Sequence, residues 1–269
     1  MPRSGSTLLQ SILSQRSDIY GSKTDPVLEY LYAARNNYTT AVEVKAQEPK
    51  LMLDTWRGFC WGGLKGYCEK ISDKNKICLK SRGIGIHYKW FEAFMPYKPK
   101  IICCVRDIKN ILTSMEKMFR NNQESSDNIL NHNTMEGTTL EKRIDIWLSS
   151  QPIGLALERT KEMFCQDIAK NIHFIQYEQL TSNPEQVMNG IYSYLNILPY
   201  KHDFNNVVST GIEDDAVYGL SNSLHKTRSK VEPSRDDSVD ILGKGLCDWI
   251  DTNPKLNWYR DAFRYSLDK

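Results

Sequence analysis

Short apolar runs alternate with polar breaks along the chain, and they predict three buried β-strands. The clearest run, Lys100–Val105, stops abruptly at Arg106-Asp107. Such a run is typical of a strand that is covered on both faces. Lys76–Lys80 comes before it and Ile172–Tyr177 comes after it. Each of these segments is short enough to be a strand rather than a helix.

Helical periodicity fills the stretches between these runs. Apolar residues at positions 108, 111, 112, 115, 118 and 119 predict one face of a helix over Ile108–Phe119. A second helical stretch runs from about Leu140 to Phe164, and Pro152 should kink or divide it. Asn183-Pro184 predicts the start of a third helix, which ends near Leu195. Strands that alternate with helices, without hairpin signals, predict an α/β fold with a central parallel sheet flanked by helices.

Two polar segments interrupt this pattern. Residues 121–139 are rich in Asn, Ser and Glu, and they fit either a substrate loop or a surface connection. Residues 211–240 are also polar and bring several basic side chains close together in sequence. Neither segment is a low-complexity linker, and the chain has no internal repeat. We therefore expect residues 1–269 to form one domain.

Composition excludes several classes of protein. The chain has 269 residues, of which 40% are hydrophobic and 25% charged, as in ordinary globular domains. Its 35 basic and 33 acidic residues give a net charge of +2, so bulk charge does not indicate nucleic-acid binding. It has no run of 18 apolar residues, so we expect no contact with a membrane. The seven cysteines lack metal-site spacing and predict reduced thiols in a cytoplasmic protein.

The first residues form a candidate anion site. Pro2-Arg3-Ser4-Gly5-Ser6-Thr7 leads directly into Leu8, Leu9, Ile12 and Leu13, which have the spacing of a helix face. A loop of small residues at the start of a helix offers free backbone N–H groups and the positive end of the helix dipole. An ordinary Ser/Thr helix cap is the alternative. The loop is not a Walker A motif, because it has one Gly and no Lys after it.

Three later segments are arranged in an order that suits this loop. Arg106 ends the strand that precedes the helix carrying Ser114, eight positions further on. Tyr177-Glu178-Gln179-Leu180 ends the third strand, and residues 224–231 read Leu-His-Lys-Thr-Arg-Ser-Lys-Val. Together with the loop, these segments resemble the sulfotransferases that use 3′-phosphoadenosine-5′-phosphosulfate (PAPS). The Arg-bearing loop is similar to that of bacterial and phage members and of tyrosylprotein sulfotransferases.

The resemblance implies a sulfotransferase fold similar to that of P-loop NTPases, with PAPS as co-substrate and no metal. It implies that the loop holds the 5′-phosphosulfate, that Arg106 and Ser114 hold the 3′-phosphate, and that Tyr177 contacts the adenosine. The candidate cofactor-binding residues are Arg3, Ser4, Gly5, Ser6, Thr7, Leu8, Arg106, Ser114, Tyr177, Arg228 and Lys230. In the family a strand precedes the loop, whereas Met1 stands directly before Pro2 here. We therefore expect the first strand, and any targeting segment before it, to be missing.

The function implied is transfer of a sulfuryl group from PAPS to a hydroxyl or amine, releasing adenosine 3′,5′-bisphosphate. A nucleotide-dependent kinase of the P-loop type and a non-catalytic nucleotide-binding module remain alternatives. The acceptor stays open among a carbohydrate, a tyrosyl peptide and a small alcohol. An aromatic-rich stretch fits either the wall of an acceptor pocket or helix packing; its members are Trp56, Phe59, Trp61 and Tyr67.

Three residues are candidates for the catalytic step. Arg3 should stabilise the charge that develops on the leaving phosphate oxygen, and Lys80 should assist the transferring group. The acceptor also needs a base. Tyrosylprotein sulfotransferases use a Glu about twenty residues past the loop, a region that contains Asp25 and Glu29 here. We favour Asp25 as the base, and a helix cap before Pro26 is the equal alternative for it.

Overall fold

Four parallel strands and many helices make up the structure. The computed structural model of the protein describes residues 1–121, 135, 137–209, 214–218 and 227–264. The strands are β1 (Ile19–Thr24), β2 (Lys76–Lys80), β3 (Ile101–Val105) and β4 (Ile172–Gln176). This confirms the predicted α/β class with parallel strands. The three strands expected from apolar runs are β2, β3 and β4.

The strands form two parallel pairs. β1 pairs with β2, starting with Ile19 opposite Lys76, and β3 pairs with β4, with Ile101 opposite Ile172. β2 and β3 do not hydrogen-bond to each other within the described residues. Residues of both strands line the large cleft described below. The parallel strands of the predicted fold are thus hydrogen-bonded in two separate pairs.

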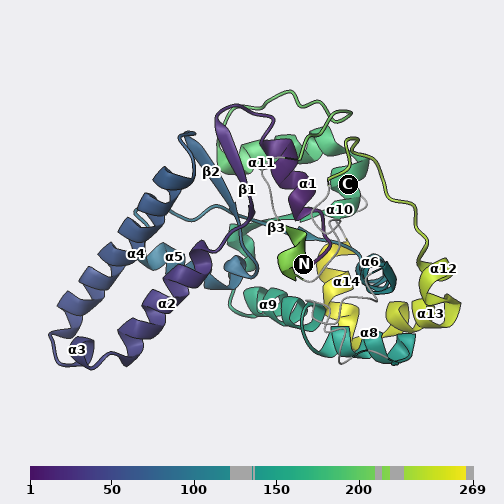
Figure 1. Cartoon of the computed structure of the whole chain (residues 1–269), viewed down its shortest axis with the longest axis horizontal. Helices are drawn as coiled ribbons and strands as arrows, with labels where there is room; N and C mark the ends of the chain where they lie inside the picture. The colour runs from purple at the N-terminus through teal and green to yellow at the C-terminus, as the bar shows by residue number, and fades with distance from the viewer. Residues whose placement is uncertain (122–134, 136, 210–213, 219–226, 265–269) are drawn as a thin grey trace.

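Helices pack on both pairs of strands (Figure 1). The first of them, α1 (Ser6–Leu13), follows the N-terminal loop and packs against β1. Beyond β3 the chain forms α6 (Ile108–Asn121), α8 (Leu140–Ser149) and α9 (Ile153–Cys165), then after β4 α10 (Tyr177–Ser182) and α11 (Pro184–Leu195). The expected helices are thus present, and Pro152 divides α8 from α9 as predicted.

An arm of helices projects from one side of the molecule (Figure 1). It consists of α2 (Val27–Thr40), α3 (Val42–Lys45) and α4 (Pro49–Ile71), with α5 (Tyr88–Phe94) at its base. Glu48 caps α4 by accepting hydrogen bonds from the backbone N–H groups of Lys50 and Leu51. The arm has its own apolar cluster, in which Cys60 and Leu64 face Phe91 and Phe94.

The C-terminal helices cover the side opposite the arm (Figure 1). They are α12 (Ser238–Leu242), α13 (Lys244–Thr252) and α14 (Asn257–Arg264). Their apolar residues join those of α6 and α8 in the largest core cluster, which includes the fully buried Trp147. Short 3-10 helices lie at η1 (Ile84–His87), η2 (Ala169–Asn171), η3 (Asp215–Tyr218) and η4 (Pro254–Leu256). No helix in the described part of the chain has the length and apolar character needed to cross a membrane.

Candidate functional site

The N-terminal loop is anchored to the end of β3. The Met1 amino group donates a hydrogen bond to the Cys104 carbonyl oxygen at 2.9 Å. The Ser4 hydroxyl lies 2.6 Å from the Met1 carbonyl oxygen and 3.0 Å from that of Cys104. Ser4 is only 2% exposed. Its hydroxyl therefore holds the loop in place, and only its backbone is left to contact a ligand.

Gly5 allows the loop to turn into α1 at close quarters with another helix. Its φ of 83° lies in the left-handed region, which favours glycine. A Cβ at this position would lie 2.6 Å from Cδ2 of Tyr177. The turn leaves the first backbone N–H groups of α1 without partners inside the helix, as at any helix start. The loop thus has the geometry of an anion site at a helix N-terminus.

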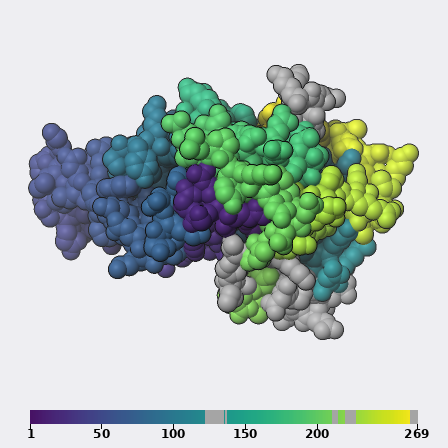
Figure 2. Space-filling model, turned by 90° about the horizontal axis from the view of Figure 1, so that it is seen from above, coloured from purple at the N-terminus to yellow at the C-terminus, as the bar shows by residue number. Residues whose placement is uncertain are grey.

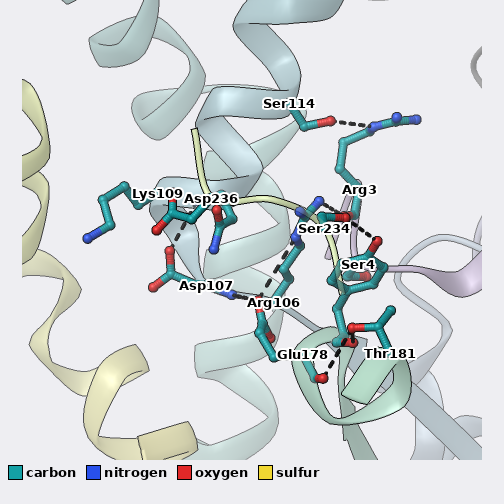
Figure 3. Close-up of polar contacts among 12 residues, drawn as sticks. Arg3, Ser4, Arg106, Asp107, Lys109, Ser114, Glu178, Thr181, Ser234 and Asp236 are labelled. Atoms are coloured by element: carbon teal, nitrogen blue, oxygen red, sulfur yellow. Dashed lines mark hydrogen bonds and ion pairs between the residues drawn. The ribbon is translucent and has the colours of Figure 1, made fainter. Parts of the chain in front are cut away.

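Arg3 and Ser114 meet although they are far apart in the sequence. The Arg3 guanidinium donates through Nε to the Ser114 hydroxyl at 3.0 Å, and Arg106 donates through Nη1 to the Arg3 carbonyl at 3.0 Å (Figure 3). Burial, together with the nearby positive charge of Arg106, lowers the pKa of Arg3 below its usual value. Two guanidinium groups held together in this way favour an anion between them.

Arg106 is fixed by its surroundings. Its guanidinium carbon lies 4.2 Å from the centroid of the Tyr177 ring, and Nε lies 4.0 Å from the Glu178 carboxylate. The Tyr259 hydroxyl donates to the Arg106 carbonyl oxygen at 2.9 Å. Burial raises the pKa of Glu178, which weakens this carboxylate as a partner. Tyr177 is held in turn, because its hydroxyl lies 2.8 Å from that of Ser234.

Lys80 reaches the loop from the end of β2. Its Nζ donates a hydrogen bond to the Thr7 hydroxyl at 3.1 Å. Its backbone N–H donates to the Ser22 hydroxyl of β1 at 2.7 Å, which fixes where the side chain begins. Lys80 and Arg3 therefore approach the start of α1 from different elements.

A single cleft of about 1920 Å³ runs along these residues. Its lining includes all eleven predicted cofactor-binding residues, from Arg3 to Lys230. Arg228 and Lys230 are exposed, and Lys230 lies 3.1 Å from the Glu232 carboxylate. Residues 224–226, which begin the predicted basic segment 224–231, lie outside the described residues. From above, the first residues lie between the blue segments of the arm side and the green segments of the later chain (Figure 2).

Asp25 does not lie in this cleft. It is 6% exposed and lines a separate pocket of about 480 Å³ together with Tyr67. Its carboxylate accepts a hydrogen bond from the Val27 backbone N–H at 3.0 Å, at the start of α2. Burial raises the pKa of Asp25, while the Val27 N–H and the Tyr67 hydroxyl lower it. The Asp25 backbone N–H donates to the Lys80 carbonyl oxygen at 2.8 Å, so the two residues are neighbours. The Asp25 carboxylate, however, makes a capping contact and lines the smaller pocket, not the cleft that Arg3 and the Lys80 side chain line.

The far half of the cleft contains residues that sequence reasoning did not single out. Tyr32 of α2 and His87 of η1 are two of them, and they line the cleft together with Glu29, which the sequence offered beside Asp25 in the region of the expected base. Burial lowers the pKa of His87, and the positive charges of Arg35 and Arg159 lower it further. Their positions depend on how the arm packs against the strands, so no local sequence pattern marks them.

The aromatic stretch of α4 divides between roles. Trp61 lines the cleft, whereas Tyr67 lines the smaller pocket. Trp56 stacks on Trp90 with ring centroids 6.3 Å apart, and Phe59 is 67% exposed. Most of this stretch therefore packs or faces outward, and Trp61 is its contribution to the cleft wall.

The described residues include no group of three or more His, Cys, Asp or Glu side chains that could hold a metal ion. The donors that surround the loop are guanidinium, ammonium, hydroxyl and backbone N–H groups. Such donors bind the oxygens of phosphate or sulfate esters.

Comparison with known proteins gives one family. The family model described as the sulfotransferase domain matches residues 1–212. No curated protein matches the chain. A solved sulfotransferase domain from the curacin biosynthetic pathway is similar to this chain at 16% identity, covering 91% of this chain and 94% of its own, with a TM-score of 0.48. The sulfotransferase domain from the Synechococcus PCC 7002 olefin synthase is similar at 14% identity, covering 91% of each chain, with a TM-score of 0.47.

Proposed function

The chain belongs to the sulfotransferase domain family, and we propose that it transfers a sulfuryl group from PAPS to a hydroxyl or amine acceptor. Adenosine 3′,5′-bisphosphate would be released. The observation that carries this proposal is the meeting of Arg3, Lys80 and Arg106 at the start of α1, from three distant parts of the chain. A P-loop kinase is the weaker reading, because the loop lacks the Walker lysine.

The 5′-phosphosulfate fits the loop chemically. Backbone N–H groups at the start of α1 would bind its oxygens, with the Thr7 hydroxyl and the Lys80 ammonium group beside them. Gly5 has no side chain, so the backbone of the loop stays open to a close approach. Arg3 adds a charged donor on the other side of the loop.

The 3′-phosphate fits the second cluster. Arg106 and Ser114 lie within one hydrogen-bond network with Arg3, and the Tyr177 ring under Arg106 offers a flat surface near the nucleoside. Arg228 and Lys230 would add positive charge at the exposed rim. Arg3, Arg106, Ser114 and Tyr177 already have partners in the protein, so little order has to be gained there when the nucleotide binds.

When bound, PAPS supplies an activated sulfuryl group on a phosphate leaving oxygen. Lys80 and Arg3 would hold that leaving oxygen and offset the negative charge that develops on it. This requires the acceptor oxygen to lie in line with the leaving oxygen, so positioning is the main task of the cleft. The acceptor proton must pass to a nearby base.

We assign the base to Glu29 in place of Asp25. Both come from the start of α2, but Glu29 lines the cleft and Asp25 faces the smaller pocket. Glu29 follows Asp25 by four residues. The base is therefore still assigned to the segment that the resemblance implies, but to a different carboxylate within it.

The direct test is transfer of labelled sulfate from PAPS to a panel containing a phenol, a sugar and a tyrosyl peptide. We expect transfer to at least one acceptor without added magnesium, and loss of transfer in Glu29→Gln with nucleotide binding retained. Arg57→Ala, a substitution on the arm outside the cleft, is the control for a general effect of mutation. Phosphate transfer from ATP with magnesium, in the absence of sulfate transfer, would instead identify a kinase.

A further inference from the structure

The far half of the cleft, where Glu29, Tyr32 and His87 lie and where we expect the acceptor, carries positive charge that the proposed donor site does not use. Arg82 follows β2 two residues after Lys80, and Arg159 projects from α9; both line the cleft. The two come from segments separated by more than seventy residues. Arg159 meets the segment after Arg82, because a Cβ on Gly83 would lie 2.4 Å from its Nη1 atom. The fold therefore brings the Arg159 guanidinium to the backbone that directly follows Arg82.

His87 and an aromatic group complete this place. The His87 ring lies 5.9 Å from that of Tyr32 and 5.6 Å from that of Trp90, measured between centroids. Arg159 lies near enough for its charge to lower the pKa of His87. Arg35 lies over the Trp90 ring, 5.5 Å from its centroid. Aromatic and histidine rings thus lie together in this part of the molecule, with guanidinium groups beside them.

These guanidinium groups lack acidic partners. Within the described residues, neither Arg82 nor Arg159 forms a hydrogen bond or an ion pair with a carboxylate. Arg159 is nevertheless half-buried, whereas Arg82 is exposed at the surface of the cleft. Three of the carboxylates elsewhere along the cleft are already paired: Glu69 with Lys65, Glu232 with Lys230 and Asp237 with Lys117.

A half-buried guanidinium without a partner loses hydration and gains no ion pair in return. An oxyanion of the ligand would supply that pair, and Arg binds carboxylate, sulfate and phosphate groups with two parallel hydrogen bonds. By contrast, a neutral acceptor would leave Arg82 and Arg159 as they are. The unpaired positive charge in this half of the cleft therefore favours an acceptor that carries a negative charge.

We propose that Arg82 and Arg159 form an oxyanion subsite that selects acceptors bearing a carboxylate, sulfate or phosphate group close to the hydroxyl that is sulfated. This inference rests on the proposed function, because it takes the Lys80 end of the cleft as the place of transfer. Arg82 lies two residues beyond Lys80, so the acceptor anion would lie next to the reacting hydroxyl. The Tyr32 and His87 rings would flank the acceptor between them.

Matched acids and amides test the subsite. The probes are 4-hydroxybenzoate, 4-hydroxyphenylacetate and N-acetyltyrosine, each compared with its own neutral amide. Binding of each probe is measured by calorimetry on the full chain saturated with adenosine 3′,5′-bisphosphate, so that the result does not depend on turnover. The Arg82→Gln/Arg159→Gln variant removes both charges. Lys161→Gln removes one exposed charge from the same helix as Arg159, outside the cleft.

We expect at least one acid to bind tenfold or more tightly than its amide. The double variant should reduce that ratio below threefold through weaker binding of the acid alone, while Lys161→Gln keeps it. Equal binding of acid and amide in all three pairs overturns the subsite, and so does a preference that survives in the double variant. Failure of the proposed function would appear separately, as acid preference without sulfate transfer from PAPS.

Discussion

The two halves of the cleft hold their cations in different ways. At the loop, Arg3 donates to Ser114, Lys80 donates to Thr7, and Arg106 donates to the Arg3 carbonyl. In the far half, Arg82 and Arg159 have no carboxylate partner among the described residues. The cations of the loop half are therefore preorganised before any ligand binds, whereas those of the far half are available to form ion pairs with a ligand.

This difference agrees with what each half has to do. A site that stabilises charge during a reaction works best when its donors are already fixed. A site that selects among acceptors needs groups whose pairing depends on the acceptor, because specificity is a difference between affinities. Substitutions in the two halves should consequently have different effects.

The largest effect is expected at Arg3. Removing one charged donor from a preorganised site costs about 10²- to 10³-fold in kcat, so Arg3→Ala should lose at least about 100-fold in sulfate transfer. The thermal midpoint should stay near that of the parent protein, because Arg106 bonds to the backbone carbonyl at this position and not to the side chain. Steady-state rates and a thermal melt check both statements. Unfolding of the variant, or full activity, would contradict the role of the loop.

A smaller and more selective effect is expected at Arg106. A charged hydrogen bond contributes about 1.5–3 kcal/mol, so Arg106→Ala should weaken adenosine 3′,5′-bisphosphate binding roughly tenfold or more. Ser114→Ala should change binding in the same direction. Adenosine 5′-monophosphate lacks the 3′-phosphate, and its binding should change much less. Calorimetry with both nucleotides tests this, and equal losses would rule out the assignment to the 3′-phosphate.

The smallest effect is expected at Asp25. Asp25→Asn retains much of the capping ability, so its rate at saturating acceptor should stay within about threefold of the parent's between pH 6 and 9. The substitution should instead change how the stability of the protein depends on pH. Burial raises the folded-state pKa of Asp25 above the ordinary value of 3.8, so the parent protein loses stability as pH rises through that range.

Asparagine does not titrate, and the thermal midpoint of Asp25→Asn relative to the parent should therefore increase from pH 4 to pH 7. A rate loss of a hundredfold with an unchanged midpoint difference would return Asp25 to the role of base. Glu29 would then be a solvated residue of α2.

Sequence reasoning located the parts of the site that depend on local spacing. The loop, β3 with Arg106, and α6 with Ser114 follow from apolar periodicity and from small residues at a helix start. β1 was not predicted, because its sequence Ile-Tyr-Gly-Ser-Lys-Thr lacks an apolar run. The internal use of the Ser4 hydroxyl was also not foreseeable, since its partner Cys104 lies one hundred residues away.

The acceptor half depends on tertiary packing and could not be predicted. His87 and Arg159 become neighbours only because α9 packs on η1, far from it in the sequence. Asp25 and Glu29 are equivalent candidates by spacing from the loop. They differ only in the structure, where Glu29 lines the cleft and Asp25 lines the smaller pocket. The separation of the strands into two pairs likewise has no signature in the apolar runs themselves.

The most direct test of the central claim is calorimetric binding of adenosine 3′,5′-bisphosphate to the full chain in the presence of EDTA. ATP with magnesium and adenosine 5′-monophosphate are measured alongside it. The loop and the Arg106 cluster predict that adenosine 3′,5′-bisphosphate binds at least tenfold more tightly than either of them, and that this preference is lost in Arg106→Ala. Tighter binding of ATP with magnesium, or no preference for the 3′-phosphate, would contradict the assignment of this cleft to PAPS.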